Sequence, residues 1–332
     1  MTSRGARDVL SRTSPVAPFE HPALFYRGEH EYVAALAPMI RAGAEAGEPV
    51  AVALPNGNLR LITEQLADLH SDLAAPAAPG VRFLDMASAG RNPGRIIPGV
   101  LLPFANAHRS GHVRIIGEPV WPGRTAREYP ACLQHEALIN AVFRGRDVTV
   151  VCTYDAERLP AGVLADARVT HPTVIEDGQE RVSGGFAPAR ALARGNEPLP
   201  HPGDAASFRF DAGRLHDARL FASRIASRLG AADDTRAALS LTVAELTTNS
   251  VLHGGGSGTL RVWADSDQLV CDVRDSGLLR DPLAGRVPPP VERPGGRGLV
   301  LVNEFAALVR IHTGATGTTV QVHLDMRPGT LP

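Results

Sequence analysis

The clearest hydrophobic pattern in this chain predicts a helix over about residues 233–252. Its core-facing positions are spaced four, three and four residues apart: Leu239, Val243, Leu246 and Ser250. Glu245, Asn249 and His253 are also four residues apart, so they share an adjoining face of the same helix. Glycines 254–256 follow and predict its end. Glu245 and Asn249 thus place a carboxylate and an amide one turn apart beside the core. This arrangement is compatible with an ordinary solvated helix face or with a polar binding site.

Short strands and glycine-rich segments surround this helix. Alternating or apolar runs predict strands at residues 207–210, 259–264, 269–273, 308–312 and 320–324. Further helices are predicted at about 212–229 and from Leu299 to Phe305. Among them lie three polar or glycine-rich boxes: Asp275-Ser276-Gly277, Gly295-Gly296-Arg297-Gly298-Leu299 and Gly314 to Thr319. Each glycine box alone is a weak signal, but together with the first helix they make four boxes in a fixed order, which is specific.

The four boxes resemble the ATP-binding domain of the GHKL (Bergerat-fold) superfamily, which gyrase, histidine kinases and MutL share. They are most similar to its small Ser/Thr-kinase branch, the anti-sigma factors. The resemblance implies an α/β two-layer sandwich that binds ATP with Mg²⁺. It also implies that Asn249 is the magnesium ligand and that Glu245 is the catalytic residue, which orients or deprotonates the attacking hydroxyl. An amide oxygen is a hard ligand that suits Mg²⁺.

The same resemblance implies which residues contact the nucleotide. Asp275 would accept a hydrogen bond from the adenine amino group, and Gly277 would let the backbone approach the base. Backbone N–H groups of the glycine box would approach the phosphates at the start of a helix. The implied set is Asn249, Asp275, Gly277, Gly295, Gly296, Arg297, Gly298, Leu299, Thr318 and Thr319. Arg297 is equally compatible with a solvated rim, and His253 with a helix cap.

One position departs from the family pattern. Family members usually have a second glycine two residues after Gly277, where this chain has Leu279. The loop 278–294 is also short and contains three consecutive prolines. These changes predict one of two outcomes. Nucleotide binding is weaker than usual, or a protein partner and not ATP orders the loop 278–294 as a lid.

The N-terminal half alternates short apolar runs with helical segments. Strands are predicted at 48–54, 81–85, 113–117 and 148–152, and helices at about 30–46, 57–72, 93–110 and 128–145. Near-continuous apolar strands suit a parallel sheet covered on both faces, so an α/β, doubly wound parallel sheet is expected. The loop Pro55-Asn56-Gly57-Asn58 has one glycine and no lysine, and is therefore not a P-loop.

Five short stretches resemble the MEDS sensory domain: His21 to Tyr26, Ala46 to Val50, Gly117 to Trp121, His135 to Asn140 and Cys152 to Asp155. The resemblance covers about residues 20–175 and implies a RecA-like input domain whose ligand the family does not define. Glu118 and Trp121 at a strand end are compatible with a ligand pocket or with an ordinary packed loop. Cys132 and His135 have a metal-like spacing, but no second Cys/His pair accompanies them.

Composition narrows the function classes. A formal net charge of −1 argues against nucleic acid as a direct partner. The chain contains no lysine, which excludes Schiff-base chemistry and a P-loop lysine. Its three cysteines are far apart and are expected as buried thiols in a reducing cytoplasm. Neither a signal peptide nor a run of about 20 apolar residues is evident, so a cytoplasmic location without membrane association is predicted.

The sequence thus predicts a disordered tail at 1–18, a MEDS-like sensory domain at 19–176, a Gly/Pro-rich linker at 177–205 and a GHKL ATPase domain at 206–328. The resemblance implies a protein that sequesters a sigma factor and phosphorylates a serine or threonine of an anti-anti-sigma antagonist, gated by the sensory domain. The alternative is a non-catalytic switch in which nucleotide only tunes affinity for a protein partner. A sensor histidine kinase is more distant, because the linker is too short for a two-helix phosphoacceptor element. Relatives of this ATP domain often dimerise, so a homodimer is a possible oligomeric state of this protein.

Overall fold

The computed structural model describes residues 19–67, 80–290 and 295–327. The chain forms two compact units, each assembled from several segments. The first comprises Met1–Asp85, Phe104–Pro122 and Ile139–Phe186, and the second comprises Met86–Pro103, Gly123–Leu138 and Ala187–Pro332. The tail 1–18 and the end of the helix predicted at 57–72 lie outside the described residues.

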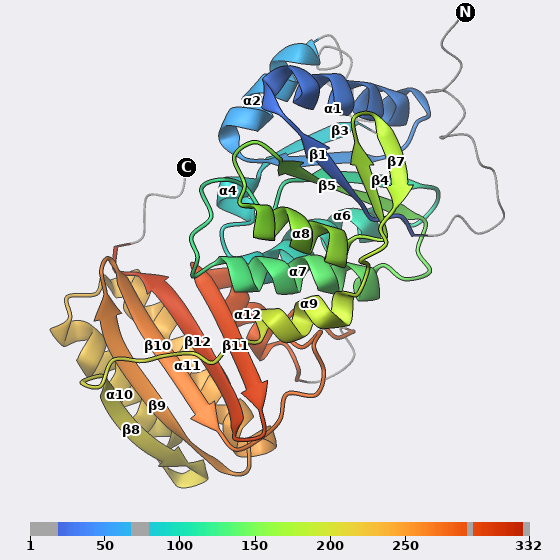
Figure 1. The fold of residues 1–332 in the computed structure, drawn as a ribbon. Coiled ribbons are helices and arrows are strands. Elements are labelled where there is room, and N and C mark those ends of the chain that lie inside the picture. The colour runs from blue at the N-terminus through green and yellow to red at the C-terminus, as the bar shows by residue number, and fades with distance from the viewer. Residues whose placement is uncertain (1–18, 68–79, 291–294, 328–332) are drawn as a thin grey trace, which may run out of the picture. The chain divides into compact units, whose positions relative to one another are not determined.

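The first unit is built on a seven-stranded sheet with the order β3-β2-β4-β5-β1-β6-β7 (Figure 1). Its strands are β1 (Pro22–Tyr26), β2 (Val50–Leu54), β3 (Val81–Asp85), β4 (Val113–Gly117), β5 (Val148–Asp155), β6 (Thr173–Glu176) and β7 (Gln179–Val182). Neighbouring strands are parallel, except that β6 and β7 form an antiparallel hairpin. The predicted α/β fold with a parallel-dominated sheet is confirmed. The strands β1, β2, β4 and β5 are buried along their whole length, as strands covered on both faces should be.

The helices of the N-terminal half include the four predicted segments and two that were not predicted, at 86–89 and 161–170. They are α1 (Gly28–Glu45), α2 (Asn56–Gln65), α4 (Met86–Ala89), α5 (Pro93–Arg95), α6 (Leu102–Ala107), α7 (Tyr129–Val142) and α8 (Ala161–Thr170). The single helix predicted at 93–110 is divided among α5, a π-helical segment η1 (Ile96–Leu101) and α6. Pro98 lies in η1 and has no backbone N–H to donate, which interrupts regular α-helical hydrogen bonding there.

The second unit contains a five-stranded antiparallel sheet with the order β11-β12-β10-β9-β8. Its strands are β8 (Ala206–Asp211), β9 (Ser257–Asp265), β10 (Gln268–Asp275), β11 (Leu308–Gly314) and β12 (Gly317–Asp325). The helices α10 (Leu215–Arg228), α11 (Asp233–His253) and α12 (Gly298–Phe305) pack on one face, and a 3₁₀ turn η2 (Ala212–Arg214) leads into α10. The predicted core stripe of α11 is at most 2% exposed: Leu239, Val243, Leu246 and Ser250. This is the expected two-layer sandwich.

The segment 177–205, predicted as a linker, contains ordered elements. It includes β7 and a helix, α9 (Pro188–Gly195), and residues 196–205 then run across the sheet face opposite α10 and α11 (Figure 1). Gln321 Nε2 donates to Pro200 O at 3.1 Å. The Asn196 side chain donates to Thr313 O at 2.8 Å and accepts from Thr313 N at 2.9 Å. The glycines and prolines here therefore mark turns between short elements.

None of the described helices combines the length and the apolar character that a membrane-spanning helix requires.

Candidate nucleotide site

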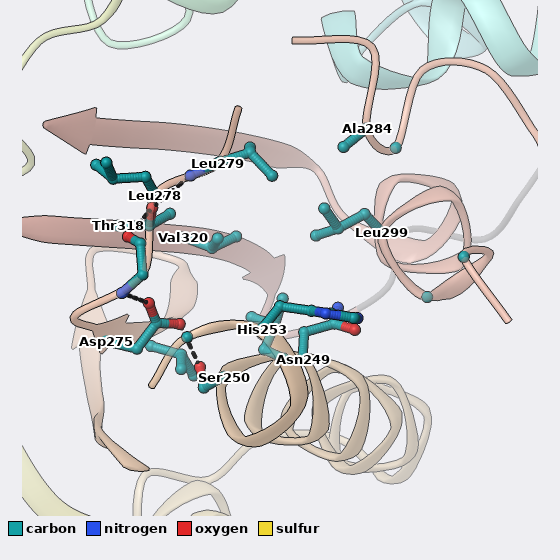
Figure 2. A pocket seen from close by; sticks show the side chains of 17 residues that line it. Asn249, Ser250, His253, Asp275, Leu278, Leu279, Ala284, Leu299, Thr318 and Val320 are labelled. Carbon is teal, nitrogen blue, oxygen red and sulfur yellow. Dashed lines mark hydrogen bonds between the residues drawn. The ribbon is translucent and has the colours of Figure 1, made fainter. Parts of the chain in front are cut away.

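A cavity of about 210 Å³ lies in the second unit, between α11, α12 and the strands β10 and β12. Its apolar wall is formed mainly by Leu246, Val273, Leu278, Leu279, Leu299 and Val320. Polar side chains of Asn249, His253, Asp275 and Thr318 also line it, and Figure 2 shows Asn249 and His253 extending from α11 toward α12. A mostly apolar cavity with a few placed polar groups is typical of a site for a small-molecule ligand.

Asp275, at the end of β10, has a carboxylate that two hydrogen bonds hold in place. Ser250 Oγ donates to Oδ2 at 2.6 Å, and the Gly277 N–H donates to Oδ1 at 2.9 Å (Figure 2). Each carboxylate oxygen can accept more than one hydrogen bond. The oriented carboxylate therefore retains the capacity to accept from an amino group of a ligand in the cavity.

Two glycines bring the backbone close to this carboxylate. A Cβ on Gly277 would lie 2.6 Å from Gly254 Cα and 2.7 Å from His253 O, and a Cβ on Gly254 would overlap the Asp275 carboxylate. The Ser276 N–H also donates to Gly254 O at 3.1 Å. The close approach predicted at Gly277 occurs here between two backbone segments. A side chain at either glycine would force α11 away from the end of β10.

Hydroxyl groups fix the chain after Gly277, including the position that departs from the family pattern. Thr318 Oγ1 donates to Gly277 O at 2.8 Å and accepts from the Leu279 N–H at 3.2 Å. Thr313 Oγ1 accepts from the same N–H at 3.1 Å. The Leu279 backbone is therefore held by β11 and β12, while its side chain adds apolar surface to the cavity.

The predicted catalytic carboxylate and magnesium ligand lie where α11 meets the start of α12. Asn249 lines the cavity, and Glu245 lies one helical turn earlier on α11. A Cβ on Gly298, the first residue of α12, would overlap Glu245 Oε2, so this carboxylate contacts the N-terminus of α12. Gly296, Gly298 and Leu299 line the same cavity. Because the N–H groups of a helix start have no intrahelical partner, this end of the cavity suits an anion.

Comparison with known families agrees with this geometry. A family model described as a histidine kinase-like ATPase domain matches residues 208–324, and a model described as the MEthanogen/methylotroph, DcmR Sensory domain (MEDS) matches residues 20–172. The chain joins a MEDS domain to a histidine kinase-like ATPase domain. The resemblances to a MEDS domain and to a GHKL-type ATPase domain are thereby confirmed.

Two solved structures illustrate how distant the structural likenesses are. The RsbU and RsbW domains of Rv1364c from Mycobacterium tuberculosis match with 19% identity and a TM-score of 0.30, over 39% of this chain and 34% of that chain. The Acinetobacter baumannii histidine kinase AdeS matches with 12% identity and a TM-score of 0.23, over 37% of this chain and 68% of that chain. The first match thus spans about a third of the mycobacterial chain, and neither likeness bears on function. No curated protein matches this chain significantly.

Three residues predicted to contact the nucleotide are not part of the cavity wall of the ATPase domain: Gly295, Arg297 and Thr319. Arg297 Nη2 donates to the carbonyl oxygens of Pro289 at 3.4 Å and Pro290 at 2.7 Å, so it binds the proline loop. Thr319 lies between the cavity-lining Thr318 and Val320, and alternation along β12 directs it to the other face.

Sequence reasoning missed the roles of two hydroxyl groups. Ser250 was expected only as a core residue, and it is 1% exposed, but its hydroxyl also orients Asp275. Its place beside Asn249 on a helix rich in site residues was the available signal. Thr313 has no comparable signal, because its contact with Leu279 depends on the hairpin register that pairs Thr313 with Thr318.

A buried asparagine at the N-terminus of α5 connects that helix with α12 inside the second unit. Asn92 Nδ2 donates to Asn303 O at 2.9 Å and to Asn303 Oδ1 at 3.1 Å, and Asn92 Oδ1 accepts from the Val309 N–H at 3.3 Å. Asn303 Nδ2 in turn donates to Leu299 O at 2.9 Å and to Gly285 O at 3.1 Å. Leu299 and Gly285 both line the cavity. Asn92 belongs to the MEDS-matching residues, so these hydrogen bonds link that segment to the wall of the nucleotide site.

In the first unit, Glu118 is fully buried among hydrogen-bond donors. Its oxygens accept from Tyr26 Oη and Tyr32 Oη, both at 3.1 Å, and from Asn58 Nδ2 at 2.7 Å. Burial raises the pKa of Glu118 to about 7, against the opposing effect of these hydrogen bonds. Of the two readings that the sequence left open, this enclosure favours a packed structural carboxyl.

Cys132 and His135, which have a metal-like spacing, are both buried. Among the described residues they do not belong to any group of three or more metal-ligating side chains.

Proposed function

We propose that the ATPase domain binds Mg·ATP and transfers the γ-phosphoryl group to a serine or threonine hydroxyl of a partner protein. One observation carries the proposal: Asn249 and Asp275 line one cavity with the glycine-rich start of α12, and Glu245, one helical turn before Asn249 on α11, contacts the first residue of α12. The apolar wall fits adenine, the Asp275 carboxylate fits its amino group, and the helix N-terminus fits phosphates.

The available groups also fit the chemistry of phosphoryl transfer. The Asn249 side-chain oxygen is a hard ligand of the type that Mg²⁺ takes beside phosphate oxygens. When bound, Mg²⁺ would offset the negative charge of the triphosphate. Glu245 would accept the hydroxyl proton as the new O–P bond forms and ADP leaves. Because the chain has no lysine, the remaining countercharge must come from backbone N–H groups and arginine.

The resemblance of the four boxes to anti-sigma factors supports a role in transcription regulation. In this proposal the ATPase domain sequesters a sigma factor and phosphorylates an anti-anti-sigma antagonist, while the MEDS domain receives the signal. The hydrogen bonds from Asn92 to Asn303 support such gating. A signal that displaces Asn92 would displace α12, whose first residue contacts Glu245.

The segment between the two matched domains argues against a sensor histidine kinase. From β7 to β8 the chain is described throughout, and its one helix there is α9, with eight residues. A long two-helix phosphoacceptor element does not fit in this segment.

A non-catalytic switch is the second candidate, and Leu279 favours it. A leucine replaces the usual glycine at the cavity wall, and Arg297 is bound to the proline loop outside that wall. Both features suit a site in which nucleotide binding is weakened and a protein partner orders the lid. In that case nucleotide would tune affinity for the sigma factor without phosphoryl transfer.

Calorimetric titration with ATP, with and without Mg²⁺, tests the first step. We expect the parent to bind Mg·ATP and Asn249→Ala to lose the magnesium-dependent part of the affinity. Thr248→Ala, at the exposed neighbouring position, is the matched control and should bind as the parent does. Failure of the parent to bind any adenine nucleotide would remove both candidate functions.

Phosphoryl transfer is tested with γ-labelled ATP and a protein extract of the source cells. Glu245→Gln should keep Mg·ATP binding and lose the acid-stable phosphoserine or phosphothreonine label that the parent produces. Binding by the parent without any transfer would leave the non-catalytic switch. An acid-labile phosphohistidine on this chain would contradict both.

A further inference from the structure

A cluster of metal-ligating side chains lies in the first unit, away from the nucleotide site. His21 immediately precedes β1, Cys152 lies in the neighbouring strand β5, and His171 caps the C-terminus of α8. All three residues are at most 1% exposed. One ligand atom from each lies within 4.8 Å of the others, so three sequence-distant segments converge on one point in the interior.

Hydrogen bonds at Nδ1 determine which imidazole nitrogen carries the proton. His171 Nδ1 lies 2.8 Å from Ala167 O, and a carbonyl oxygen only accepts, so Nδ1 is the donor. His21 Nδ1 lies 3.2 Å from Asn140 Oδ1, whose amide is oriented by donation from Nδ2 to Thr170 O at 2.8 Å. In the neutral rings both Nε2 atoms therefore carry a lone pair.

This arrangement is the one that protein metal sites use. Metal-bound histidines usually donate their other ring N–H to a carbonyl or carboxylate, which fixes the tautomer and the ring orientation. Here Ala167 O and the Asn140 amide oxygen take that role. The supporting groups are already in place around the two Nε2 atoms.

The distances also match a tetrahedral site. His21 Nε2 lies 3.5 Å from Cys152 Sγ. With bond lengths of about 2.05 Å to nitrogen and 2.3 Å to sulfur, a tetrahedral N–Zn–S edge is about 3.5 Å long. The two imidazole rings have centroids 4.0 Å apart, and the ligand atoms of all three residues lie within 4.8 Å of one another, which is compatible with an N–Zn–N edge of about 3.3 Å.

We infer that His21, Cys152 and His171 form a binding site for a Zn²⁺-class metal ion in the MEDS domain. Two imidazoles and a thiolate are a donor set that zinc prefers over the oxygen-seeking Mg²⁺ and Ca²⁺. A water molecule or a further side chain completes the coordination.

Metal binding releases a proton that the metal-free hydrogen bond retains. Without metal, the Cys152 thiol donates to His21 Nε2 across the 3.5 Å contact. With metal, the thiol proton is released to solvent and both Sγ and Nε2 become ligands, so each ion bound displaces one proton.

The test uses the full-length chain, unfolded in guanidinium with a chelator and refolded with Co²⁺ as a spectroscopic probe. We expect one Co²⁺ per chain, with intense tetrahedral d–d bands and a near-ultraviolet thiolate-to-cobalt band, and displacement of both by one equivalent of Zn²⁺. Cys152→Ser should lose the thiolate band and, as loss of a direct ligand, bind at least about 100-fold more weakly. Asn140→Ala, which removes the support of His21, should weaken binding about 10–100-fold.

The other two thiols provide the control. The chain has three cysteines, so the double variant Cys132→Ser, Cys271→Ser retains Cys152 alone and should keep the full cobalt spectrum. This variant decides the question even if Cys152→Ser does not fold. Absence of a thiolate band in the refolded parent would overturn the inference, as would loss of that band in the double variant with its circular dichroism unchanged.

Discussion

Replacement of Asp275 by asparagine removes a charge from the cavity and keeps the shape of the side chain. The remaining oxygen can still accept from the Gly277 N–H, which donates to Oδ1 at 2.9 Å in the parent. The Ser250 hydroxyl, 2.6 Å from Oδ2, can rotate to accept from the new amide group. We therefore expect Asp275→Asn to fold, with its free energy of unfolding lowered by no more than about 1 kcal/mol.

The affinity for ATP should fall much more than the stability. The adenine amino group would lose a charged acceptor, because the amide nitrogen only donates and the amide oxygen already accepts from the Gly277 N–H. Hydrogen bonds to charged groups contribute about 1.5–3 kcal/mol, which corresponds to an increase in Kd of about 10–150-fold. Guanine has a carbonyl oxygen where adenine has the amino group, so the new amide donor should narrow the preference for ATP over GTP.

Calorimetric titration of both proteins with Mg·ATP and Mg·GTP measures these changes, with thermal unfolding as the check on folding. Asp267→Asn, at an exposed turn between β9 and β10, is the control and should leave both affinities unchanged. An ATP affinity within twofold of the parent in folded Asp275→Asn would refute the assignment of this carboxylate to adenine.

Three further substitutions test buried groups in the two units. Burial raises the pKa of Glu118 from an ordinary 4.5 to about 7, so the unfolded chain releases this proton at lower pH than the folded chain. The free energy of unfolding should fall by about 3 kcal/mol as pH rises from about 4.5 to about 7, and denaturant titrations of Glu118→Gln should lack this slope. Gly94→Ala should lower the free energy of unfolding by about 1–3 kcal/mol, because its Cβ would overlap Asn303 Oδ1. Arg286→Met should raise the free energy of unfolding by up to about 4 kcal/mol, since Arg286 is buried and its Nη1 has no hydrogen-bond partner among the described residues. Thermal unfolding measures both changes.

Each of these has a result that contradicts it. A pH slope that persists in Glu118→Gln would assign the titration to other groups. Gly99→Ala places its Cβ 3.2 Å from the flexible Arg95 side chain and serves as the control for Gly94→Ala; equal losses in both variants would deny a special role to the contact with Asn303. A less stable Arg286→Met would mean that the guanidinium makes a net favourable interaction.

Most of the architecture could be predicted from two features of the sequence: the apolar stripe of the helix at 233–252 and the order of the glycine boxes. The offsets of Leu239, Val243 and Leu246 depend only on helical period, so the buried face of α11 could be predicted without any tertiary information. Glu245 and Asn249 are placed by the same period. The position of Gly298 against Glu245 required the family resemblance, because nothing local brings the start of α12 to that turn of α11.

Contacts between distant segments could not be predicted from local pattern. Asn92 and Asn303 are 211 residues apart, and each is an unremarkable polar residue in its own segment. The contact of His21 with Cys152 depends on the pairing of β1 with β5, which the strand order alone decides. The linker prediction overlooked α9 because the surrounding glycines and prolines dominate the composition there.

The backbone contact between Gly254 and Gly277 has a consequence for the entropy of ligand binding. Since α11 and β10 meet there without side chains, and Ser250 and Gly277 already hold Asp275, recognition of the base requires little ordering of the protein. Gly295 and Gly296, in contrast, are exposed and have φ values of 81° and 79°, a conformation that glycine adopts freely. If this glycine-rich segment binds the phosphates as proposed, the loss of conformational freedom on binding should fall mainly there, and adenosine should bind with a smaller entropic penalty than ATP.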